Sequence, residues 1–322
     1  MPPGPRLLVV RFSSLGDVVL TTPLLRAIRT RHPEADTTCV VKSRYADLLA
    51  GNPAVTRVVA MAPREPLSAL AARLDPAEYH ARIDLQDSPR SRRLRRLLGG
   101  SWAVVDRRRA ARWALIWLGV NRYRGRLPAA EQFIEAAAGL EVQPDGKPAE
   151  VFPTADDEAR ATALVPEGAV ALVPGSRWAS KRWPAARWRA LADRLTARGL
   201  SLVAVGSEDE RSLLNGPGVI EAYGLPLLTT AAVLRRARVV VANDTGLMHL
   251  ATAVGRPVIV LLGPTVGAFG YLPYGVSAQV LEREVACRPC TASGSDHCPL
   301  GHHRCMIEIA PEAVAQAVER AA

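Results

Sequence analysis

The chain has 322 residues, of which 48% are hydrophobic and 22% charged, a composition typical of a soluble globular protein with a large core. It has no apolar run near the ~20 residues that a membrane span needs, and the run at residues 7–10 is too short for a signal peptide. We therefore exclude an integral membrane protein and expect a cytoplasmic location.

The net charge of +10 is distributed unevenly along the chain. Residues 1–150 carry +9 and residues 151–322 carry +1. Such a basic half attracts polyanions, whether nucleic acid, anionic lipid or a phosphorylated glycan. The alternative explanation of the positive charge is a general preference for arginine over lysine, since the chain has only three lysines. The densest clusters are Arg90, Arg92, Arg93, Arg95 and Arg96, and then Arg107, Arg108, Arg109 and Arg112.

Short apolar runs alternate with amphipathic stretches, which is typical of parallel sheets covered by helices. In the first half this pattern predicts a helix over residues 18–31 and another that begins at residue 46. The predicted strands of this half are residues 6–12, 37–42, 55–61, 81–85 and 101–106.

A linker is predicted at residues 142–166, which are rich in Pro, Asp, Glu and Gly. The strand pattern then restarts, with helices predicted over residues 183–198 and 311–321. The predicted strands of this half are residues 169–173, 201–205, 218–222, 237–242 and 258–262. We therefore predict an α/β protein of two doubly wound, Rossmann-like domains, residues 1–150 and 151–322, which face a central cleft. Ligands of such folds bind outside the carboxyl ends of the strands.

The turn at residues 243–249 joins a predicted strand to a predicted helix. A helix that begins there offers free backbone N–H groups and the positive end of its dipole, which suits a phosphate. Asp244 or Thr245 could equally be a plain N-cap. His249 lies about one turn into the helix, so the predicted phosphate-binding residues are Asp244, Thr245, Gly246 and His249.

A second such turn follows the first predicted strand and contains Ser13, Ser14, Gly16 and Asp17. Gly16 permits a tight turn, and Asp17 stands at the start of the helix. Asp17 is a candidate general base, and the alternative is an N-cap. The turn lacks the GxGxxG pattern of dinucleotide-binding proteins, which argues against a redox enzyme.

Strand ends in the second half supply further candidates. Ser176 follows the strand at residues 169–173, and Lys181 could neutralise a diphosphate leaving group. After the next strand, Glu208 or Glu210 could accept hydrogen bonds from ribose hydroxyls or cap the following helix. Trp183 and Trp188 are interpreted as packing residues.

Taken together, these motifs resemble glycosyltransferase family 9, the bacterial lipopolysaccharide heptosyltransferases. The matching segments are residues 11–17 (RFSSLGD), 22–24 (TPL), 174–176 (PGS), 181–184 (KRWP), 243–251 (NDTGLMHLA), 263–265 (GPT), and the pairs 298–299 and 305–306 in the tail. The resemblance implies the GT-B architecture, with an acceptor-binding first domain and a donor-binding second domain.

The resemblance also implies residue roles. Asp17 resembles the family's general base, with Ser13, Ser14 and Gly16 on the acceptor side. Lys181 resembles the lysine that faces the donor diphosphate. The remaining implied donor contacts are Ser176, Glu208 (or Glu210), Asp244, Thr245, Gly246 and His249.

The implied reaction is an inverting, metal-independent transfer of heptose from ADP-heptose to the inner core of lipopolysaccharide. The partners are then an ADP-sugar and an anionic lipopolysaccharide precursor, and we expect a monomer that contacts the cytoplasmic face of the inner membrane transiently. One alternative is a transferase or epimerase that uses another nucleotide sugar. Another is a basic nucleic-acid-binding protein, which needs aromatic platforms among the arginines. We expect no nucleic acid, because Trp102, Trp113 and Trp117 are interpreted as core or membrane-facing residues.

Four of the five cysteines lie at residues 287–305, with His297, His302 and His303 among them. In a cytoplasmic protein this pattern favours metal binding over disulfides. One interpretation is a structural zinc site; the other is reduced cysteines or a redox-sensitive pair. The candidate zinc ligands are Cys287, Cys290, Cys298 and Cys305, and Cys39 is interpreted as a core residue.

Overall fold

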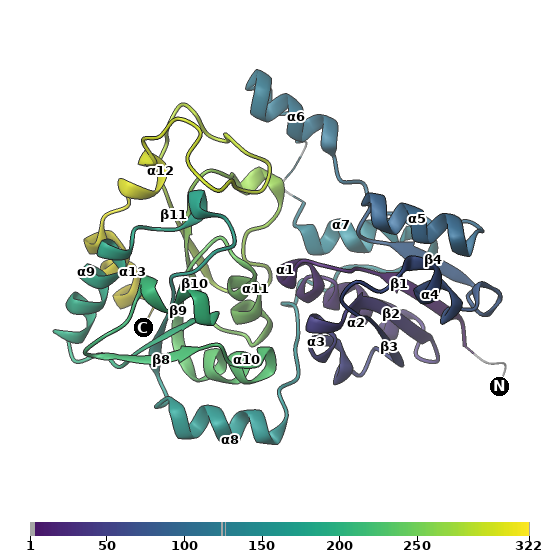
Figure 1. The fold of residues 1–322 in the computed structure, drawn as a ribbon, viewed down its shortest axis with the longest axis horizontal. Helices are drawn as coiled ribbons and strands as arrows, with labels where there is room; N and C mark the ends of the chain where they lie inside the picture. The colour runs from purple at the N-terminus through teal and green to yellow at the C-terminus, as the bar shows by residue number, and fades with distance from the viewer. Residues whose placement is uncertain (1–3, 124, 126, 322) are drawn as a thin grey trace. The chain divides into compact units, whose positions relative to one another are not determined.

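The computed structural model describes residues 4–123, 125 and 127–321 and divides into two compact units. The first unit comprises Met1–Arg108 and Leu127–Phe152, and the second comprises Arg109–Arg126 and Pro153–Ala322. Each unit contains one sheet with helices on both faces (Figure 1). Segment Arg109–Arg126 therefore groups with the second unit although its neighbours in sequence belong to the first.

The first unit contains a five-stranded parallel sheet with the order β3-β2-β1-β4-β5. Helices α2 and α7 pack together, as do α4 and α5. The strands are β1 (Arg6–Val10), β2 (Asp36–Lys42), β3 (Arg57–Met61), β4 (Ala81–Asp84) and β5 (Ala103–Val104). The helices are α1 (Leu15–Val19), α2 (Thr22–Arg31), α3 (Asp47–Ala50), α4 (Leu67–Ala72), α5 (Pro89–Leu98) and α7 (Ala129–Ala136), with short 3-10 turns η1 (Ser43–Tyr45), η2 (Pro76–Glu78) and η3 (Ala138–Leu140).

The helix predicted over residues 18–31 is two helices, α1 and α2, because the chain breaks at Leu20 and Thr21. Pro23 lies in the first turn of α2, where a missing N–H costs nothing. The Thr21 hydroxyl donates to the Asp17 carbonyl oxygen at 2.9 Å. Because of this break, the turn after β1 leads into the short helix α1, which is separate from the longer helix α2.

The second unit contains a six-stranded parallel sheet with the order β11-β10-β9-β6-β7-β8. Strands β6, β7 and β10 are buried on both faces, and such strands consist of continuous apolar runs. The strands are β6 (Ala169–Val173), β7 (Leu202–Gly206), β8 (Val219–Tyr223), β9 (Ala237–Asn243), β10 (Val258–Leu262) and β11 (Ala278–Glu282). The helices are α6 (Arg109–Leu118), α8 (Ala155–Leu164), α9 (Ala185–Thr196), α10 (Leu227–Arg236), α11 (Gly246–Ala253), α12 (Arg304–Ile307) and α13 (Pro311–Arg320), with 3-10 turns η4 (Ala179–Lys181), η5 (Glu208–Leu213) and η6 (Gly267–Phe269).

Trp183 and Trp188 lie in the core between the sheet and helices α9 and α13. Both are fully buried, and their rings meet edge to face with centroids 5.2 Å apart. The Trp183 indole N–H donates to the Ile309 carbonyl oxygen at 3.1 Å. Their interpretation as packing residues is confirmed.

The predicted linker at residues 142–166 was wrong in its second half, where α8 forms. Thr154 and Asp157 make a capping box at its start, and Asp157 Oδ1 also accepts a hydrogen bond from Thr229 of α10 at 2.6 Å. The polar composition that predicted a linker is the composition of a capped surface helix. Among residues 4–123, 125 and 127–321, no helix is long and apolar enough to cross a membrane.

Candidate active site

Each sheet has a point where the chain changes direction along the strand order, and ligands of doubly wound folds bind at such points. In the first unit this point lies between β1 and β4, and in the second it lies between β6 and β9. Asp17 follows β1, whereas Ser176 follows β6 and Asp244 follows β9. The sequence candidates therefore lie at the switch point of their own sheets.

Asp17 occupies the third position of α1, and Ser14 is the N-cap. Asp17 Oδ2 accepts hydrogen bonds from the Ser14 N–H at 3.0 Å and the Ser14 hydroxyl at 2.7 Å. Oδ1 forms an ion pair with Arg11. The alternative that Asp17 is the N-cap itself is therefore wrong by three positions, because the serine hydroxyl and the aspartate make a capping box.

The pKa of Asp17 is lowered to about 2. Burial raises this pKa, but the positive charge of Arg11 and the hydrogen bonds from Ser14 outweigh it. Arg11 is itself buried: it donates to the Leu85 carbonyl oxygen and its guanidinium stacks 5.0 Å from the Phe133 ring centroid. Asp17 is consequently a carboxylate at neutral pH, the form that accepts a proton.

The other first-unit candidates shape the backbone around Asp17. The Ser13 N–H donates to Gln86 Oε1 at 3.2 Å, which connects the turn after β1 to the turn after β4, and the Ser13–Ser14 peptide bond is cis. Gly16 is buried within α1. Neither Arg11 nor Gln86 was among the predicted site residues, although a charged residue directly after a buried strand is a usable signal for Arg11.

In the second unit, Lys181, Asp244 and Thr265 meet from three separate loops. Lys181 Nζ lies 2.6 Å from Asp244 Oδ2, and the Thr265 hydroxyl donates to the same oxygen at 2.8 Å. Burial raises the pKa of Asp244, but Lys181 and Thr265, together with the charge of His249, lower it below its usual value. This is a buried ammonium–carboxylate pair at the switch point.

Helix α11 begins directly after this pair. Thr245 occupies its N-cap position, but its side chain makes no capping hydrogen bond with the helix. Gly246 begins the helix, and His249 is buried one turn further on, with its ring centroid 6.5 Å from that of Tyr271. The first-turn N–H groups thus lack a side-chain cap, an arrangement suited to an anionic ligand.

Asn243 holds the neighbouring loops in place. Its Nδ2 donates to the Pro174 carbonyl oxygen at 2.7 Å, and its Oδ1 accepts the Trp183 N–H at 3.1 Å. These bonds fix the loop that contains buried Ser176 and the turn that precedes α9. The sequence pattern assigns no role to Asn243, because its partners are set by the strand order.

Of the two acidic candidates after β7, Glu210 rather than Glu208 lies against the Ser176 loop. A methyl group on Gly175 would come within 2.1 Å of a Glu210 carboxylate oxygen, and Glu210 Oε2 accepts the Ser207 N–H at 3.0 Å. Glu208 pairs with Arg211 at 2.7 Å, and its side chain is 64% exposed.

The cysteines at residues 287–305 do not support the interpretation as a zinc site. They are free thiols, and the described part of the chain contains no group of three or more His, Cys, Asp or Glu side chains placed to hold a metal ion. Cys305 lies in the core behind β10, where burial raises its pKa to about 11. Burial also raises the pKa of Cys290, and Cys287 Sγ lies 3.9 Å from His302 Nε2. The other interpretation, reduced cysteines, agrees with this arrangement, and Cys39 is buried as predicted.

The segment that carries these cysteines braces the loops of the second-unit site. Arg288 donates to the carbonyl oxygens of Gly263 and Thr265 at 2.5 and 2.9 Å. Ser180, the neighbour of Lys181, exchanges hydrogen bonds with Ser295 at 3.0 and 2.8 Å. The segment therefore fixes both loops that bear on Asp244.

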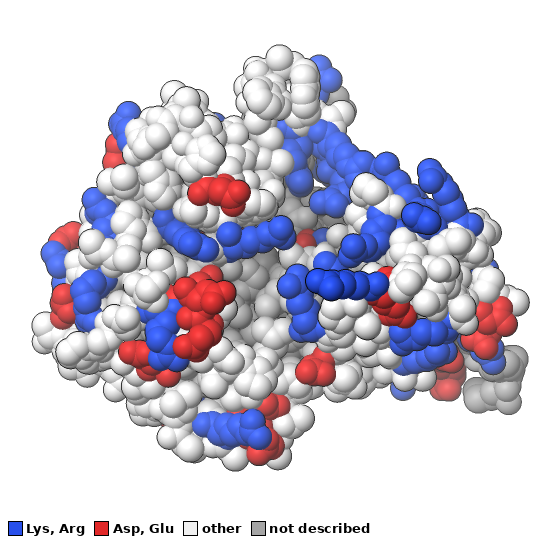
Figure 2. Space-filling model, viewed as in Figure 1, with Lys and Arg blue, Asp and Glu red and all other residues white. Residues whose placement is uncertain are grey.

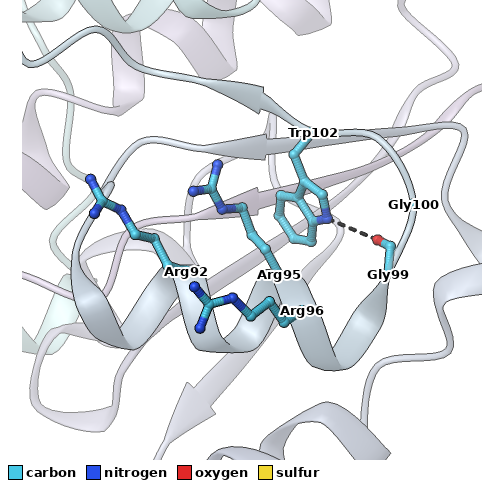
Figure 3. Close-up of a pocket in the computed structure, with 6 residues that line it drawn as sticks. All are labelled: Arg92, Arg95, Arg96, Gly99, Gly100 and Trp102. Atoms are coloured by element: carbon cyan, nitrogen blue, oxygen red, sulfur yellow. Dashed lines mark hydrogen bonds between the residues drawn. The ribbon is translucent and has the colours of Figure 1, made fainter.

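A basic pocket of about 480 Å³ lies in the first unit, beside the C-terminal half of α5 (Figure 3). Arg92 and Arg95 of this pocket both form ion pairs with Asp87, and the Trp102 indole N–H donates to the Gly99 carbonyl oxygen at 3.0 Å. None of the sequence candidates for the active site lines it. Its lining residues are Arg92, Arg95, Arg96, Gly99, Gly100 and Trp102.

Two Rossmann-like units, with a buried carboxylate at one switch point and a lysine beside an uncapped helix at the other, define the class of GT-B glycosyltransferases. The family model for glycosyltransferase family 9 (heptosyltransferase) matches residues 67–298. Lipopolysaccharide heptosyltransferase 1 of Pseudomonas aeruginosa is 32% identical, over 95% of this chain and 92% of that protein. The chain belongs to glycosyltransferase family 9.

Solved structures share the fold of this chain. A family 9 glycosyltransferase from Veillonella parvula superposes with a TM-score of 0.81 at 21% identity, over 98% of this chain and 97% of that one. The Escherichia coli heptosyltransferase WaaC with ADP-2-deoxy-2-fluoro heptose superposes with a TM-score of 0.71 at 27% identity, over 98% and 100% of the two chains. The protein is thus a glycosyltransferase enzyme of GT-B architecture, as the sequence predicted.

Proposed function

We propose that the protein transfers a heptose from ADP-heptose to the inner core of lipopolysaccharide, with inversion and without a catalytic metal. The observation that carries the proposal is the Lys181–Asp244–Thr265 cluster beside the start of α11. It supplies one ammonium group and uncapped backbone N–H groups, which complement a diphosphate. The heptosyltransferase names of its relatives supply the sugar and the acceptor.

In this mechanism Asp17 accepts the proton of the acceptor hydroxyl as that oxygen attacks the anomeric carbon. A carboxylate of low pKa serves here because the hydroxyl becomes strongly acidic as its bond to carbon forms. The C–O bond to the diphosphate breaks on the opposite face of the sugar, and the ADP leaves with the bonding electrons. Lys181 and the N–H groups of α11 stabilise its charge.

The remaining proposed donor contacts are Ser176, Gly246, His249 and Glu210. Ser176 and Gly246 present backbone or hydroxyl groups to the phosphates, and His249 stands behind them within α11. Glu210 replaces Glu208 as the proposed partner of the ribose hydroxyls, since it lies against the Ser176 loop.

The acceptor binds on the first unit, beside Asp17, with Ser13, Ser14 and Gly16 forming the turn that it meets. The excess of +9 in residues 1–150 suits an anionic, phosphorylated acceptor. Figure 2 shows Lys and Arg crowded over the face of this unit near α5. The enzyme acts as a monomer in the cytoplasm and contacts the inner membrane transiently.

A thermal-shift comparison of nucleotides tests the donor, and transfer assays test the catalytic residues. We expect ADP and ADP-heptose to raise the Tm more than UDP, GDP and their sugars. Asp17→Asn should lower kcat by about 10²–10⁴-fold and leave the ADP Kd unchanged, while Lys181→Gln should weaken ADP binding. Asp47→Asn, an exposed carboxylate of the same unit, is the matched control. Equal stabilisation by all nucleotides, or wild-type turnover of Asp17→Asn, would contradict the proposal.

A further inference from the structure

Helix α6 presents large apolar side chains to solvent. Trp113 is 56% exposed, Trp117 is 70% exposed and Leu118 is 58% exposed, with Val120 beyond the helix end at 45%. Trp113 and Trp117 are four residues apart and so lie on one face of the helix. A contiguous exposed apolar face of this kind marks an interaction site.

The opposite side of α6 is attached to the second unit. Ala114 is its buried residue, and the Arg112 guanidinium lies 5.0 Å from the Phe269 ring centroid. The Tyr123 ring lies 6.0 Å from the same ring, so Phe269 of η6 holds both ends of the segment. The tryptophan face is therefore turned outward by contacts on the other side. Figure 1 shows that α6 does not cover the six-stranded sheet of its own unit.

The charged residues of the chain segment around α6 are of one sign. Residues 107–130 include seven arginines and no Asp or Glu. Figure 2 shows the surface over α6 as mainly uncharged. Tryptophan is the residue most suited to the headgroup level of a bilayer, and arginine pairs with anionic lipid phosphates. At ten residues, α6 is too short to span a bilayer but long enough to lie in its interface.

We propose that α6 is a membrane-interface anchor whose Trp113, Trp117 and Leu118 enter an anionic lipid surface while the exposed Arg109 and Arg122 bind its phosphates. The inference rests on the proposed function, because a lipid-linked acceptor brings the enzyme to a membrane. A second copy of this chain fits this face less well, since it would bring two all-basic segments together.

Sedimentation of the full-length protein with lipid vesicles tests the anchor. We expect binding to vesicles of phosphatidylethanolamine and phosphatidylglycerol, weakened by salt, and little binding to phosphatidylcholine alone. The double variant Trp113→Ser/Trp117→Ser should bind the anionic vesicles at least ~10-fold more weakly. Leu164→Ser/Leu300→Ser, which removes two exposed apolar side chains elsewhere, is the matched control and should bind as the wild type does.

Two further readouts separate the anchor from the catalytic proposal. The double serine variant should retain ADP binding and transfer to an acceptor stripped of its lipid chains, but transfer less to a vesicle-embedded acceptor. Wild-type vesicle binding by the double variant would overturn the anchor. The anchor would also be overturned if the wild type formed a dimer in the analytical ultracentrifuge and the double variant did not. If the wild type cannot use the soluble acceptor, the proposed function fails even where the vesicle result stands.

Discussion

Arg11 controls the protonation state of Asp17, because its charge opposes the effect of burial on that carboxyl. Replacing Arg11 with methionine should raise the Asp17 pKa by ~1–3 units. We therefore expect the acid limb of the kcat/KM profile to move to higher pH, as measured by transfer assays across the pH range. Arg11→Lys keeps the charge and should keep the limb low. Superimposable profiles for the wild type and Arg11→Met would exclude this role.

The same pair predicts a pH dependence of stability. The folded pKa of Asp17, about 2, lies below the usual aspartate value. Asp17 therefore stabilises the fold fully above the usual value, and this contribution is lost as pH falls towards 2. Denaturant titrations of the wild type and Asp17→Asn should differ most at neutral pH and converge only as the pH falls to about 2. If the difference in unfolding free energy between the two proteins grew on acidification, the pKa of Asp17 would not be lowered in the folded state.

The Lys181–Asp244 pair predicts a strong energetic coupling. Asp244→Asn leaves a nearly buried ammonium without its counter-charge and should lower the free energy of unfolding by ~2–4 kcal/mol at neutral pH. The double variant Lys181→Met/Asp244→Asn should recover part of this loss. A double-mutant cycle by chemical denaturation measures the coupling, and additive effects would show that the two side chains do not interact.

Among the elements, the loop after β6 depends on a glycine. A methyl group on Gly175 would overlap the end of the Glu210 side chain, which is partly exposed and can move, so Gly175→Ala should raise the donor KM and destabilise the second unit by no more than about 1 kcal/mol. Gly139→Ala, where an added methyl meets nothing within 4 Å, is the control and should be neutral. Removing the clash with Glu210→Ala should restore stability to the Gly175→Ala protein. If Glu210→Ala does not restore stability, the overlap is not the cause of the destabilisation.

The elements that could be predicted are those whose burial is visible in the sequence itself. The bounds of β6 and β10 agree with the predicted ones because strands buried on both faces are unbroken apolar runs. Helix α5 was missed, since its apolar stripe is narrow and its arginines suggested only a charge cluster. Helix α8 was missed for its polar composition.

The sequence predicted individual loops of the candidate site but not the contacts between those loops. The turns at Asp17 and Asp244 follow recognisable strands, so their place at the carboxyl edge could be predicted. Contacts such as Lys181 with Asp244 or Ser13 with Gln86 join loops more than 60 residues apart. They depend on which strands are neighbours, and local patterns do not encode the strand order.

For the whole molecule, the uneven charge predicts how transfer responds to salt. The first 150 residues carry +9, so the attraction of an anionic acceptor weakens as ionic strength rises. We expect kcat/KM for the acceptor to fall several-fold between low and physiological salt, while the ADP Kd changes less. Repeating the assay with an acceptor that lacks phosphate should flatten this dependence. If kcat/KM for the acceptor without phosphate depended equally steeply on salt, the salt effect would belong to donor binding.

The assignment of Arg109–Arg126 to the second unit means that the chain passes between the units three times, at residues 108–109, 126–127 and 152–153. A chimera made by joining two family members at a single junction near residue 152 would therefore separate α6 from Phe269, the ring against which Arg112 and Tyr123 pack. Exchange of donor specificity between relatives should succeed only when the graft carries residues 109–126 with the second unit. In genetic terms the donor module is discontinuous, and recombination has to respect three breakpoints rather than one.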